Sequence, residues 1–382
     1  MVHRKFWLQK IEELWKERTI LWLSGVRRSG KTCICESLDK IEYFDCELPR
    51  VRRTMEDPQA FLDSLRGKRI VLDEIHRLHN PSEILKIAAD HYSDIRILAT
   101  GSSTLAASSK FKDTLTGRKL ELLLTPMIHS DLRDFKQENL QHRFLRGGLP
   151  PFFLAKKIPE RDFQEWIDSY WAKDVQELFR LERRYSFLKF TELIMINSGG
   201  IFEATKYSSP CEVSRPTITN YLKVLEATHV INIIRPFSSH LSSEIISAPK
   251  VYAFDTGFVC YHRGWHELRS EDNGCLWEHF ILNELIGRFQ TKQIFYWRDK
   301  RGHEIDFIIT PRGSNPIAIE CKWSSADFNP KNIRAFHKRY LKGKFLVAAN
   351  DVTQSFVHTF GGISVKFVNL QDLITELSQY LQ

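Results

Sequence analysis

The sequence lacks the cysteine pattern of a metal site or a disulfide framework. Its seven cysteines are scattered along the chain, with no CxxC pair and no His-rich tract beside them. Zinc sites and disulfide scaffolds both depend on cysteines at characteristic spacings. We therefore expect neither, and the reducing cytoplasm is the expected compartment.

Long apolar runs are missing as well. No run approaches the roughly 18 residues that a membrane-spanning helix needs. The opening segment, MVHRKFWLQKIEELWKER, is charged throughout and has no apolar core or small-residue cleavage site. A secretory signal requires both features, so we expect no signal sequence and no membrane partner.

The overall composition is that of a globular protein. The 382 residues are 42% hydrophobic and 27% charged, which excludes a disordered chain, a coiled coil and a collagen-like repeat. At roughly 150 residues per domain, this length predicts two or three domains. Lys and Arg number 55 against 47 Asp and Glu, a net charge of +8. That balance permits a polyanionic partner such as DNA without requiring one.

Strands and helices alternate through the first predicted domain, residues 1–125. An amphipathic helix opens it, and its apolar stripe is Trp7, Ile11, Leu14 and Trp15. Helices at 58–65 and 81–91 lie among five predicted strands: 19–23, 41–46, 69–73, 95–100 and 119–124. Such alternation predicts an α/β domain with a mostly parallel sheet covered on both faces.

Two further regions follow, each with its own pattern. Residues 126–248 are rich in helical patterns and form the second predicted domain. Residues 249–382 return to α/β alternation. Their predicted helices are 277–289, 329–340 and one from 371 onward, and their predicted strands are 294–297, 303–309, 316–322, 344–348 and 364–368.

The segment GVRRSGKT carries the strongest functional signal. It fits the pattern G-x-x-x-x-G-K-[ST], lies just after a strand and opens a helix, which is the context of a phosphate-binding loop. The glycines let backbone N–H groups face the phosphates, Lys31 reaches the β- and γ-phosphates, and Thr32 holds magnesium. We predict that ATP is bound by the loop residues Gly25, Arg27, Arg28, Ser29, Gly30, Lys31, Thr32 and Cys33.

A second motif, RIVLDE, supports this assignment. An apolar strand delivers Asp73 to its carboxyl end, where ligands bind in open α/β sheets. Asp73 is predicted to coordinate Mg²⁺ with Thr32, and Glu74 to orient and polarise the attacking water. ATP and Mg²⁺ are thus the predicted cofactors.

Three more polar residues near the next strands are candidates for the nucleotide site. Thr100 and Ser102 are placed to read the γ-phosphate, although Ser102 or Ser103 equally suits a helix N-cap. Arg118 is a candidate for a charge-neutralising arginine; the alternative is a surface residue at the start of a strand.

These motifs together resemble a known family. GVRRSGKT, DPQAFL, IVLDEIHRL, ILATGSS, LTGR, LTPM and FLRGGLPPFF, with the later PKVYAFDTGF, HEIDFII and IAIECK, resemble a bacterial and archaeal group of AAA-type ATPases. That group is related to the STAND branch of P-loop ATPases and carries a C-terminal domain of unknown function. The resemblance covers nearly the whole chain. It implies ATP binding and a switch or motor role, but no substrate.

The middle region contains a candidate DNA-reading helix. Ser214 suits its N-cap, Pro216 its first turn, and its polar side chains include Arg215, Thr217, Asn220 and Lys223. Helical patterns at 187–197 and 202–207 precede it and the strand-like HVINIIRPF follows it, which predicts a winged helix. In that fold such a helix enters the DNA major groove; a winged helix used only for protein packing is the alternative.

The last region carries a carboxylate pattern on two predicted strands. Residues two apart on a strand share a face, so Glu304 and Asp306 point together, as do Glu320 and Lys322. If the strands are neighbours, Asp306, Glu320 and Lys322 converge. This resembles the D…ExK signature of restriction-endonuclease-like folds, which implies that Asp306 and Glu320 hold magnesium and Lys322 assists the chemistry. Glu278 or Glu284 would supply a further acid. The alternative is a nuclease-like fold that no longer cuts, or a solvated strand pair.

Three functions are consistent with this sequence. The first is an ATP-regulated, DNA-acting enzyme with catalytic residues Glu74, Asp306, Glu320 and Lys322. The second is an ATP-dependent switch or DNA-binding regulator whose nuclease-like fold only binds. The third is a protein-remodelling ATPase without a nucleic-acid role. The sequence leaves open whether the chain forms a homo-oligomer.

Overall fold

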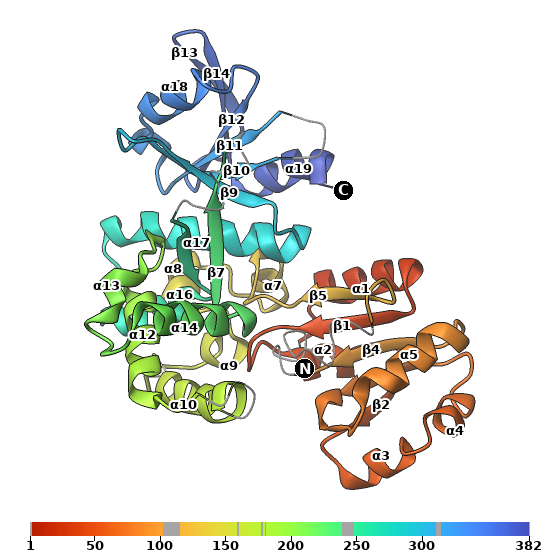
Figure 1. Ribbon diagram of the computed structural model, residues 1–382. Helices are drawn as coiled ribbons and strands as arrows, with labels where there is room; N and C mark the ends of the chain where they lie inside the picture. The colour runs from red at the N-terminus through yellow and green to blue at the C-terminus, as the bar shows by residue number, and fades with distance from the viewer. Residues whose placement is uncertain are drawn as a thin grey trace. The chain divides into compact units, whose positions relative to one another are not determined.

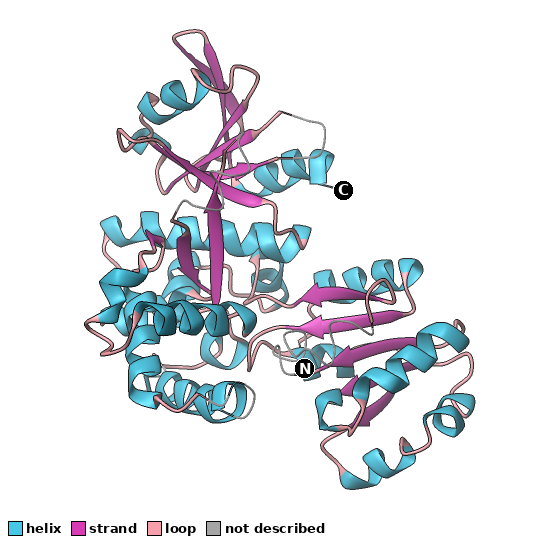
Figure 2. Cartoon of the chain, viewed as in Figure 1, coloured by secondary structure: helices cyan, strands magenta, loops and turns pink. Residues whose placement is uncertain are grey.

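The chain forms two compact units in the computed structural model (Figures 1 and 2). The described residues are 2–101, 115–158, 160–176, 179, 181–238, 248–310 and 315–381. The first unit comprises residues 1–140, 146–184 and 220–230, and the second comprises residues 141–145, 185–219 and 231–382. None of the helices in these described ranges combines the length and apolarity needed to cross a membrane.

A five-stranded parallel sheet is the centre of the first unit (Figure 1). Its strand order is β2-β3-β4-β1-β5, and every neighbouring pair is parallel. The strands are β1 (Ile20–Ser24), β2 (Glu42–Asp45), β3 (Arg69–Asp73), β4 (Arg96–Thr100) and β5 (Lys119–Leu123). This parallel α/β sheet confirms the predicted P-loop NTPase fold.

Both faces of this sheet are apolar because its strands are buried in the middle of the unit. On one face, α1 (Lys5–Glu17) packs Trp7, Ile11 and Trp15 against Leu21 and Leu23 of β1. On the other face, β1 contributes Ile20 and Trp22 to a second cluster, which α4 (Pro58–Asp63) and α5 (Pro81–His91) cover. The predicted apolar stripe of the opening helix therefore faces the core, with Leu14 only partly buried.

Short helices complete the first unit. They are α2 (Lys31–Glu36), α3 (Pro49–Thr54), η1 (Ile75–Arg77), α7 (His129–Asp134), α9 (Pro150–Phe153), α10 (Glu160–Tyr170) and the π-helical turn η3 (Trp171–Gln176). The Arg4 side chain ties α1 to the rest, because it donates to Asp131 of α7 at 2.6 Å and to the carbonyl of Ser29 at 2.9 Å.

A nine-stranded mixed sheet forms the second unit, in the order β13-β14-β12-β11-β10-β9-β7-β8-β6. Its strands are β6 (Gly200–Ile201), β7 (Ile231–Pro236), β8 (Lys250–Ala253), β9 (Ile294–Arg298), β10 (Glu304–Ile309), β11 (Ile317–Lys322), β12 (Lys344–Ala349), β13 (Phe356–Phe360) and β14 (Ile363–Val368). Strands β11, β12 and β14 run parallel, whereas β9, β10 and β11 are antiparallel neighbours.

The helices described in the second unit come from the middle and from the C-terminal part of the chain. They are α12 (Arg184–Ile196), α13 (Ala204–Ser208), α16 (Thr256–Arg263), α17 (Ser270–Phe289), α18 (Lys331–His337) and α19 (Leu370–Leu381). Helix α14 (Arg215–Ala227) contributes residues to both units. Helix α8 (Leu140–Arg146) is held by a buried ion pair, in which Arg143 Nη1 lies 3.3 Å from Asp255 Oδ2.

Candidate nucleotide site and carboxylate cluster

The loop between β1 and α2 has a backbone that only glycine permits at its first position. Gly25 has φ +149°, and a Cβ atom there would lie 2.5 Å from the carbonyl oxygen of Leu124. Gly30, with φ +97°, is in the left-handed region just before α2 begins. Any other residue at Gly25 would clash with backbone, so the loop curls where the sequence motif requires it to curl.

Lys31 turns back onto this loop. Its Nζ donates to the carbonyl oxygens of Gly25 at 2.9 Å and Val26 at 3.2 Å. Desolvation lowers the pKa of Lys31 below its ordinary value, although the nearby charges of Glu74, Asp174 and Asp73 oppose this. An ammonium in a poorly hydrated site is stabilised by an anion, so the position suits a phosphate.

Three hydroxyl groups converge on the Asp73 carboxylate at the end of β3. Thr32 Oγ1 donates to Asp73 Oδ2 at 3.0 Å, and Tyr43 and Thr100 make short hydrogen bonds to the same side chain. Asp73 is only 5% exposed, and a buried carboxylate needs such donors. The structure thus brings the predicted pair Thr32 and Asp73 together. Thr100 lies against Asp73 and also accepts from the Glu74 N–H at 3.1 Å.

Glu74 leaves β3 in a left-handed conformation, with φ +52° and ψ +41°. This unusual backbone for a non-glycine residue precedes η1, and His76 Nδ1 of η1 lies 3.0 Å from Glu74 Oε2. Burial raises the pKa of Glu74, but the hydrogen bond and charge of His76 and the charge of Lys31 outweigh it, so the pKa lies below its ordinary value. The carboxylate is therefore ionised at neutral pH.

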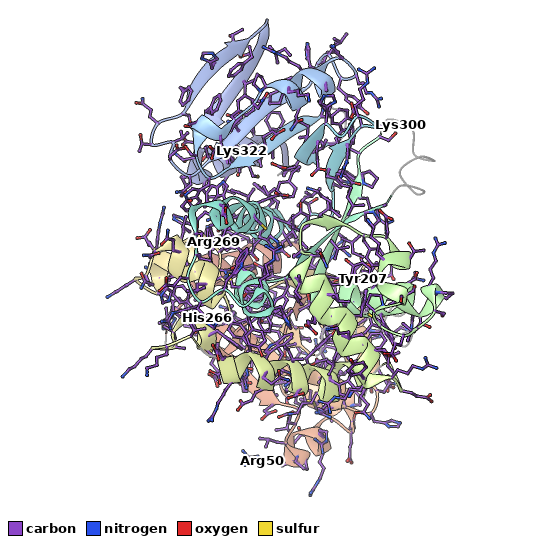
Figure 3. All side chains as sticks on the ribbon, turned by 90° about the vertical axis from the view of Figure 1, so that its left-hand side faces the viewer. Arg50, Tyr207, His266, Arg269, Lys300 and Lys322 are labelled. Atoms are coloured by element: carbon purple, nitrogen blue, oxygen red, sulfur yellow. The ribbon has the colours of Figure 1, made fainter. Side chains whose placement is uncertain are left out.

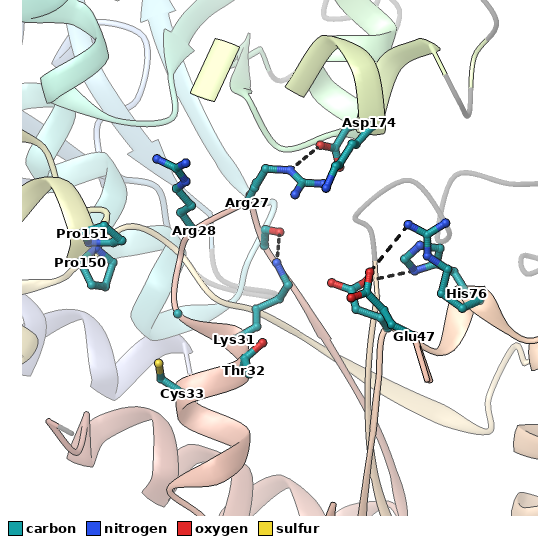
Figure 4. A pocket seen from close by; sticks show the side chains of 15 residues that line it. Arg27, Arg28, Lys31, Thr32, Cys33, Glu47, His76, Pro150, Pro151 and Asp174 are labelled. Carbon is teal, nitrogen blue, oxygen red and sulfur yellow. Dashed lines mark hydrogen bonds and ion pairs between the residues drawn. The ribbon is translucent and has the colours of Figure 1, made fainter. Parts of the chain in front are cut away.

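These residues surround a cavity of about 380 Å³ (Figure 4), a size in the range of small-molecule sites. Its lining is Gly25, Arg27, Arg28, Gly30, Lys31, Thr32, Cys33, Glu47, Glu74, His76, Arg77, Pro150, Pro151, Lys173 and Asp174. Eight of the predicted nucleotide-site residues are in that lining. Asp73 lies behind Thr32, and Ser29 is buried at 1% exposure.

Of the two remaining predicted residues, only Arg118 is among those that the structure describes. Ser102, with its alternative Ser103, lies outside the described residues. Arg118 pairs with Asp90, Nε to Oδ1 at 2.7 Å, and is not among the described residues that line the cavity.

Several residues of this site were not foreseen from the sequence, among them Tyr43, His76 and Asp174. In the sequence, Tyr43 is an ordinary aromatic residue of a predicted strand. His76 is a polar residue that follows the Asp73–Glu74 pair, with no motif of its own. Asp174 is 147 residues from its partner Arg27, and no local pattern points to it.

The predicted carboxylates of the second unit, Asp306 and Glu320, also lie close together. Because β10 and β11 are antiparallel neighbours, Asp306, Glu320 and Lys322 lie together. Lys322 Nζ is 2.9 Å from Glu320 Oε2 and 3.9 Å from Asp306 Oδ2, and Asp306 Oδ2 accepts from the Cys321 N–H at 2.7 Å. Lys322, labelled in Figure 3, belongs to β11 of this sheet.

A second lysine joins this cluster from β8. The buried Lys250 Nζ lies 3.3 Å from Glu278 Oε1 and 2.5 Å from Glu304 Oε1. Burial, and then the charge of Asp306, raise the pKa of Glu278 and of Glu320 to about 7 each. Of the two acids considered on α17, Glu278 is in the cluster, whereas Glu284 pairs with Arg288 at 2.8 Å.

The cluster has few ligands for a metal ion. Within the described ranges, no group of three or more His, Cys, Asp or Glu side chains is arranged to hold one. Asp306 and Glu320 are two carboxylates on neighbouring strands, and Glu320 is only 2% exposed. Two carboxylates with waters are sufficient for Mg²⁺, which seldom has an all-protein cage.

The candidate DNA-reading residues lie on α14. Ser214 directly precedes this helix and accepts from the Thr217 N–H at 3.4 Å, as an N-cap does. Arg215, Asn220 and Lys223 are exposed, Thr217 is half-buried, and the apolar stripe is buried.

The fold and the loop geometry together define a class of protein, the P-loop ATPases. Residues 17–132 match the family described as AAA domain, in agreement with the P-loop NTPase fold of this part of the chain. Residues 137–269 and 273–370 match two families described only as domains of unknown function, DUF8612 and DUF4143.

Individual proteins similar to this chain add little about its biology. Uncharacterized proteins of Mycobacterium bovis and Mycobacterium tuberculosis are each 25% identical to it over 328 residues, which is 83% of this chain and 73% of theirs. Among solved structures, a Walker-type ATPase of Pyrococcus abyssi is 15% identical, with 69% of this chain and 96% of that chain covered and a TM-score of 0.47.

Proposed function

We propose that this protein binds and hydrolyses ATP and uses the nucleotide cycle to act on DNA. The observation that carries the ATP part is that Lys31, Thr32 and Glu74 line one cavity and that Asp73 accepts a hydrogen bond from Thr32 beside it. These groups come from the first turn of α2 and from the end of β3, at the carboxyl edge where open parallel sheets bind ligands.

Each of these side chains would have a separate role in phosphoryl transfer. Lys31 would contact the β- and γ-phosphates and Glu74 would orient the attacking water. Thr32 and Asp73, whose oxygens are 3.0 Å apart, suit the hard oxygen coordination of Mg²⁺ and would hold it. When bound, the ion neutralises phosphate charge.

The DNA part of the proposal is supported by the topology around α14. Helices α12, α13 and α14 are followed by the antiparallel pair β7 and β8, and β6, between α12 and α13, pairs with β8. This order of elements is that of a winged helix, and it supports Arg215, Thr217, Asn220 and Lys223 as the residues that contact DNA.

For the second unit we propose a candidate metal-dependent nuclease site, with restriction-endonuclease-like geometry. Asp306 and Glu320 would hold Mg²⁺, and Lys322 would stabilise charge on the scissile phosphate. The alternative is an ATP-dependent switch or DNA-binding regulator with an inactive nuclease-like fold. The ion pairs of Lys250 and Lys322 favour this alternative, because they already neutralise part of the acidic charge.

A plasmid-nicking assay with Mg²⁺ or Mn²⁺, with and without ATP, separates these readings. Wild type, Lys31→Ala and Asp306→Ala are compared. Nicking that Asp306→Ala abolishes supports the nuclease, and the Lys31→Ala lane reports whether ATP controls it. Intact plasmid in every lane, with ATP turnover that Lys31→Ala eliminates, supports the switch or regulator. Normal turnover in Lys31→Ala contradicts the nucleotide-site assignment.

A further inference from the structure

Arg27 of the phosphate loop is held twice by one segment of the chain. Its Nε lies 3.0 Å from Asp174 Oδ2, and its carbonyl oxygen accepts from Trp166 Nε1 at 3.0 Å. Both partners belong to residues 160–176, which comprise α10 and η3 and are called the clamp segment here. Figure 4 shows the Arg27 side chain turned toward Asp174 at the cavity.

The charge of Asp174 is unexpected at a site for phosphates. Its carboxylate is 11% exposed, lines the nucleotide cavity and favours the charged form of Lys31. Because Lys31 in such loops addresses the β- and γ-phosphates, Asp174 lies near the place of the terminal phosphate. An incoming triphosphate would repel this carboxylate and compete with it for the Arg27 guanidinium.

The clamp segment leads from this ion pair to α14 through buried contacts. The ring of Trp166 stacks on that of Tyr170, with centroids 5.3 Å apart, and the Tyr170 hydroxyl lies 2.7 Å from Thr228 Oγ1. Thr228 Oγ1 also donates to the Val224 carbonyl at 2.8 Å, which leaves its lone pairs able to accept from Tyr170. Trp166, Tyr170 and Thr228 are each at most 2% exposed.

We propose that Arg27 and Asp174 form the nucleotide-sensing pair of this protein, which ATP opens and ADP leaves closed. On opening, the clamp segment releases the loop, and the Tyr170–Thr228 contact transmits the change to the C-terminal end of α14. This inference rests on the proposed function, because it takes ATP as the ligand of the cavity. A π-helical turn such as η3 is a frequent feature of functional segments.

Nucleotide affinities test the sensing pair. Asp174→Asn removes the repelling charge and should raise the ratio of ATP to ADP affinity by about fivefold to tenfold. Arg27→Gln should lower that ratio by a similar factor, and the double variant should not be the sum of the two. The matched control is Glu165→Gln in the same clamp segment, whose carboxylate is 66% exposed and lies 3.9 Å from Arg28. An equal ratio in Asp174→Asn and Glu165→Gln overturns the proposal.

Hydrogen exchange tests the sensing role in the wild-type chain and the transmission in Tyr170→Phe. In the wild-type chain, a non-hydrolysable ATP analogue should increase amide exchange in residues 160–176 and 220–228, and ADP should not. In Tyr170→Phe, the response should persist in 160–176 and disappear from 220–228. Identical exchange with the ATP analogue and with ADP overturns the sensing role, and an unchanged response of 220–228 in Tyr170→Phe overturns the transmission.

Failure of the proposed function would give different binding results from failure of the sensing pair alone. If wild type binds neither nucleotide, or if Lys31→Ala binds both as wild type does, the assignment of the cavity to ATP is wrong and the sensing pair falls with it. If wild type binds ATP in a Lys31-dependent way but does not distinguish ATP from ADP through Asp174, the ATP site stands and only the sensing pair is wrong.

Discussion

At the scale of the residue, Asp73 shows how hydroxyl donors hold a buried carboxylate in place. Thr32, Tyr43 and Thr100 all donate to its carboxylate. Those donors offset the cost of burying the charge, and one of them, Thr32, is itself a predicted magnesium ligand. The predicted catalytic residue Glu74 is the next residue, with its backbone in an unusual conformation held by η1.

Removal of the Glu74 charge should separate chemistry from binding. Glu74→Gln is expected to lower kcat for ATP by at least about 100-fold, because a general base contributes at least that much, while the Kd for ATP changes little. Steady-state ATPase assays and equilibrium binding measure the two quantities. Glu47→Gln is the matched control, since Glu47 lines the same cavity but lies beyond the end of β2. Equal losses of kcat in both variants would contradict the role of Glu74.

Gly25 offers a test of the loop backbone. Gly25→Ala should destabilise the fold by about 1–3 kcal/mol and abolish nucleotide binding, because the new Cβ would meet the Leu124 carbonyl at 2.5 Å. Gly264→Ala is the control: its φ is also positive, at +67°, but open space surrounds it. Urea unfolding and ATP titration compare the two. ATP binding that survives in Gly25→Ala would show that the loop tolerates a different path.

At the scale of the element, α14 combines a buried stripe with an exposed polar face. Ile218, Tyr221 and Leu225 are buried, whereas Arg215 and Lys223 are exposed. The spacing of apolar residues in the sequence is sufficient to predict this division. The contact of its C-terminal end with Tyr170 could not be predicted in that way.

Loss of the exposed cations of α14 should weaken DNA binding. Arg215→Ala and Lys223→Ala are each expected to lower the affinity for duplex DNA and to reduce the slope of log K against log salt by roughly one. Anisotropy titrations at several salt concentrations measure both effects. Glu226→Ala, an exposed acid on the same helix, should not weaken binding. An unchanged salt slope in both cation variants would favour a winged helix that packs only against protein.

At the scale of the whole molecule, the carboxylate cluster links several distant elements of the second unit. Lys250 of β8 and Glu278 of α17 meet β10 and β11 there. Since the pKa of Glu278 and of Glu320 is raised to about 7, the folded chain keeps protons that the unfolded chain releases near pH 4.3. Stability should therefore fall as pH rises from about 4 through about 7.

A thermal-unfolding series checks this expectation. The Tm attributable to the second unit should decrease between about pH 5 and pH 8, and Mn²⁺ should raise it more at about pH 8 than at about pH 5, because ionised carboxylates bind the cation. Asp306→Asn should reduce both effects. Asp327→Asn is the control, because Asp327 is an exposed acid that lines one pocket together with Glu278 and Asp306. A Tm response to Mn²⁺ that is independent of pH would contradict metal binding by these carboxylates.

The sequence by itself determined the parts that depend on local pattern. Motifs alone predict the GVRRSGKT loop and the Asp73–Glu74 pair. The alternation of side chains along a strand places Glu320 and Lys322 on one face, and the strand–helix alternation predicted the parallel sheet. The three-domain division at 125 and 248, the winged helix and the nuclease-like fold stay predictions.

Only the tertiary structure decided which distant side chains complete the sites. Asp174 reaches Arg27 across 147 residues, Tyr43 reaches Asp73 across 30, and Lys250 reaches Glu278 across 28. Periodicity reports which face of an element is buried, but not which element covers it or where along it a charge is placed. The covering element and the position of each charge follow from the packing of whole helices and strands. That packing places Asp174, the one carboxylate that we infer to distinguish ATP from ADP.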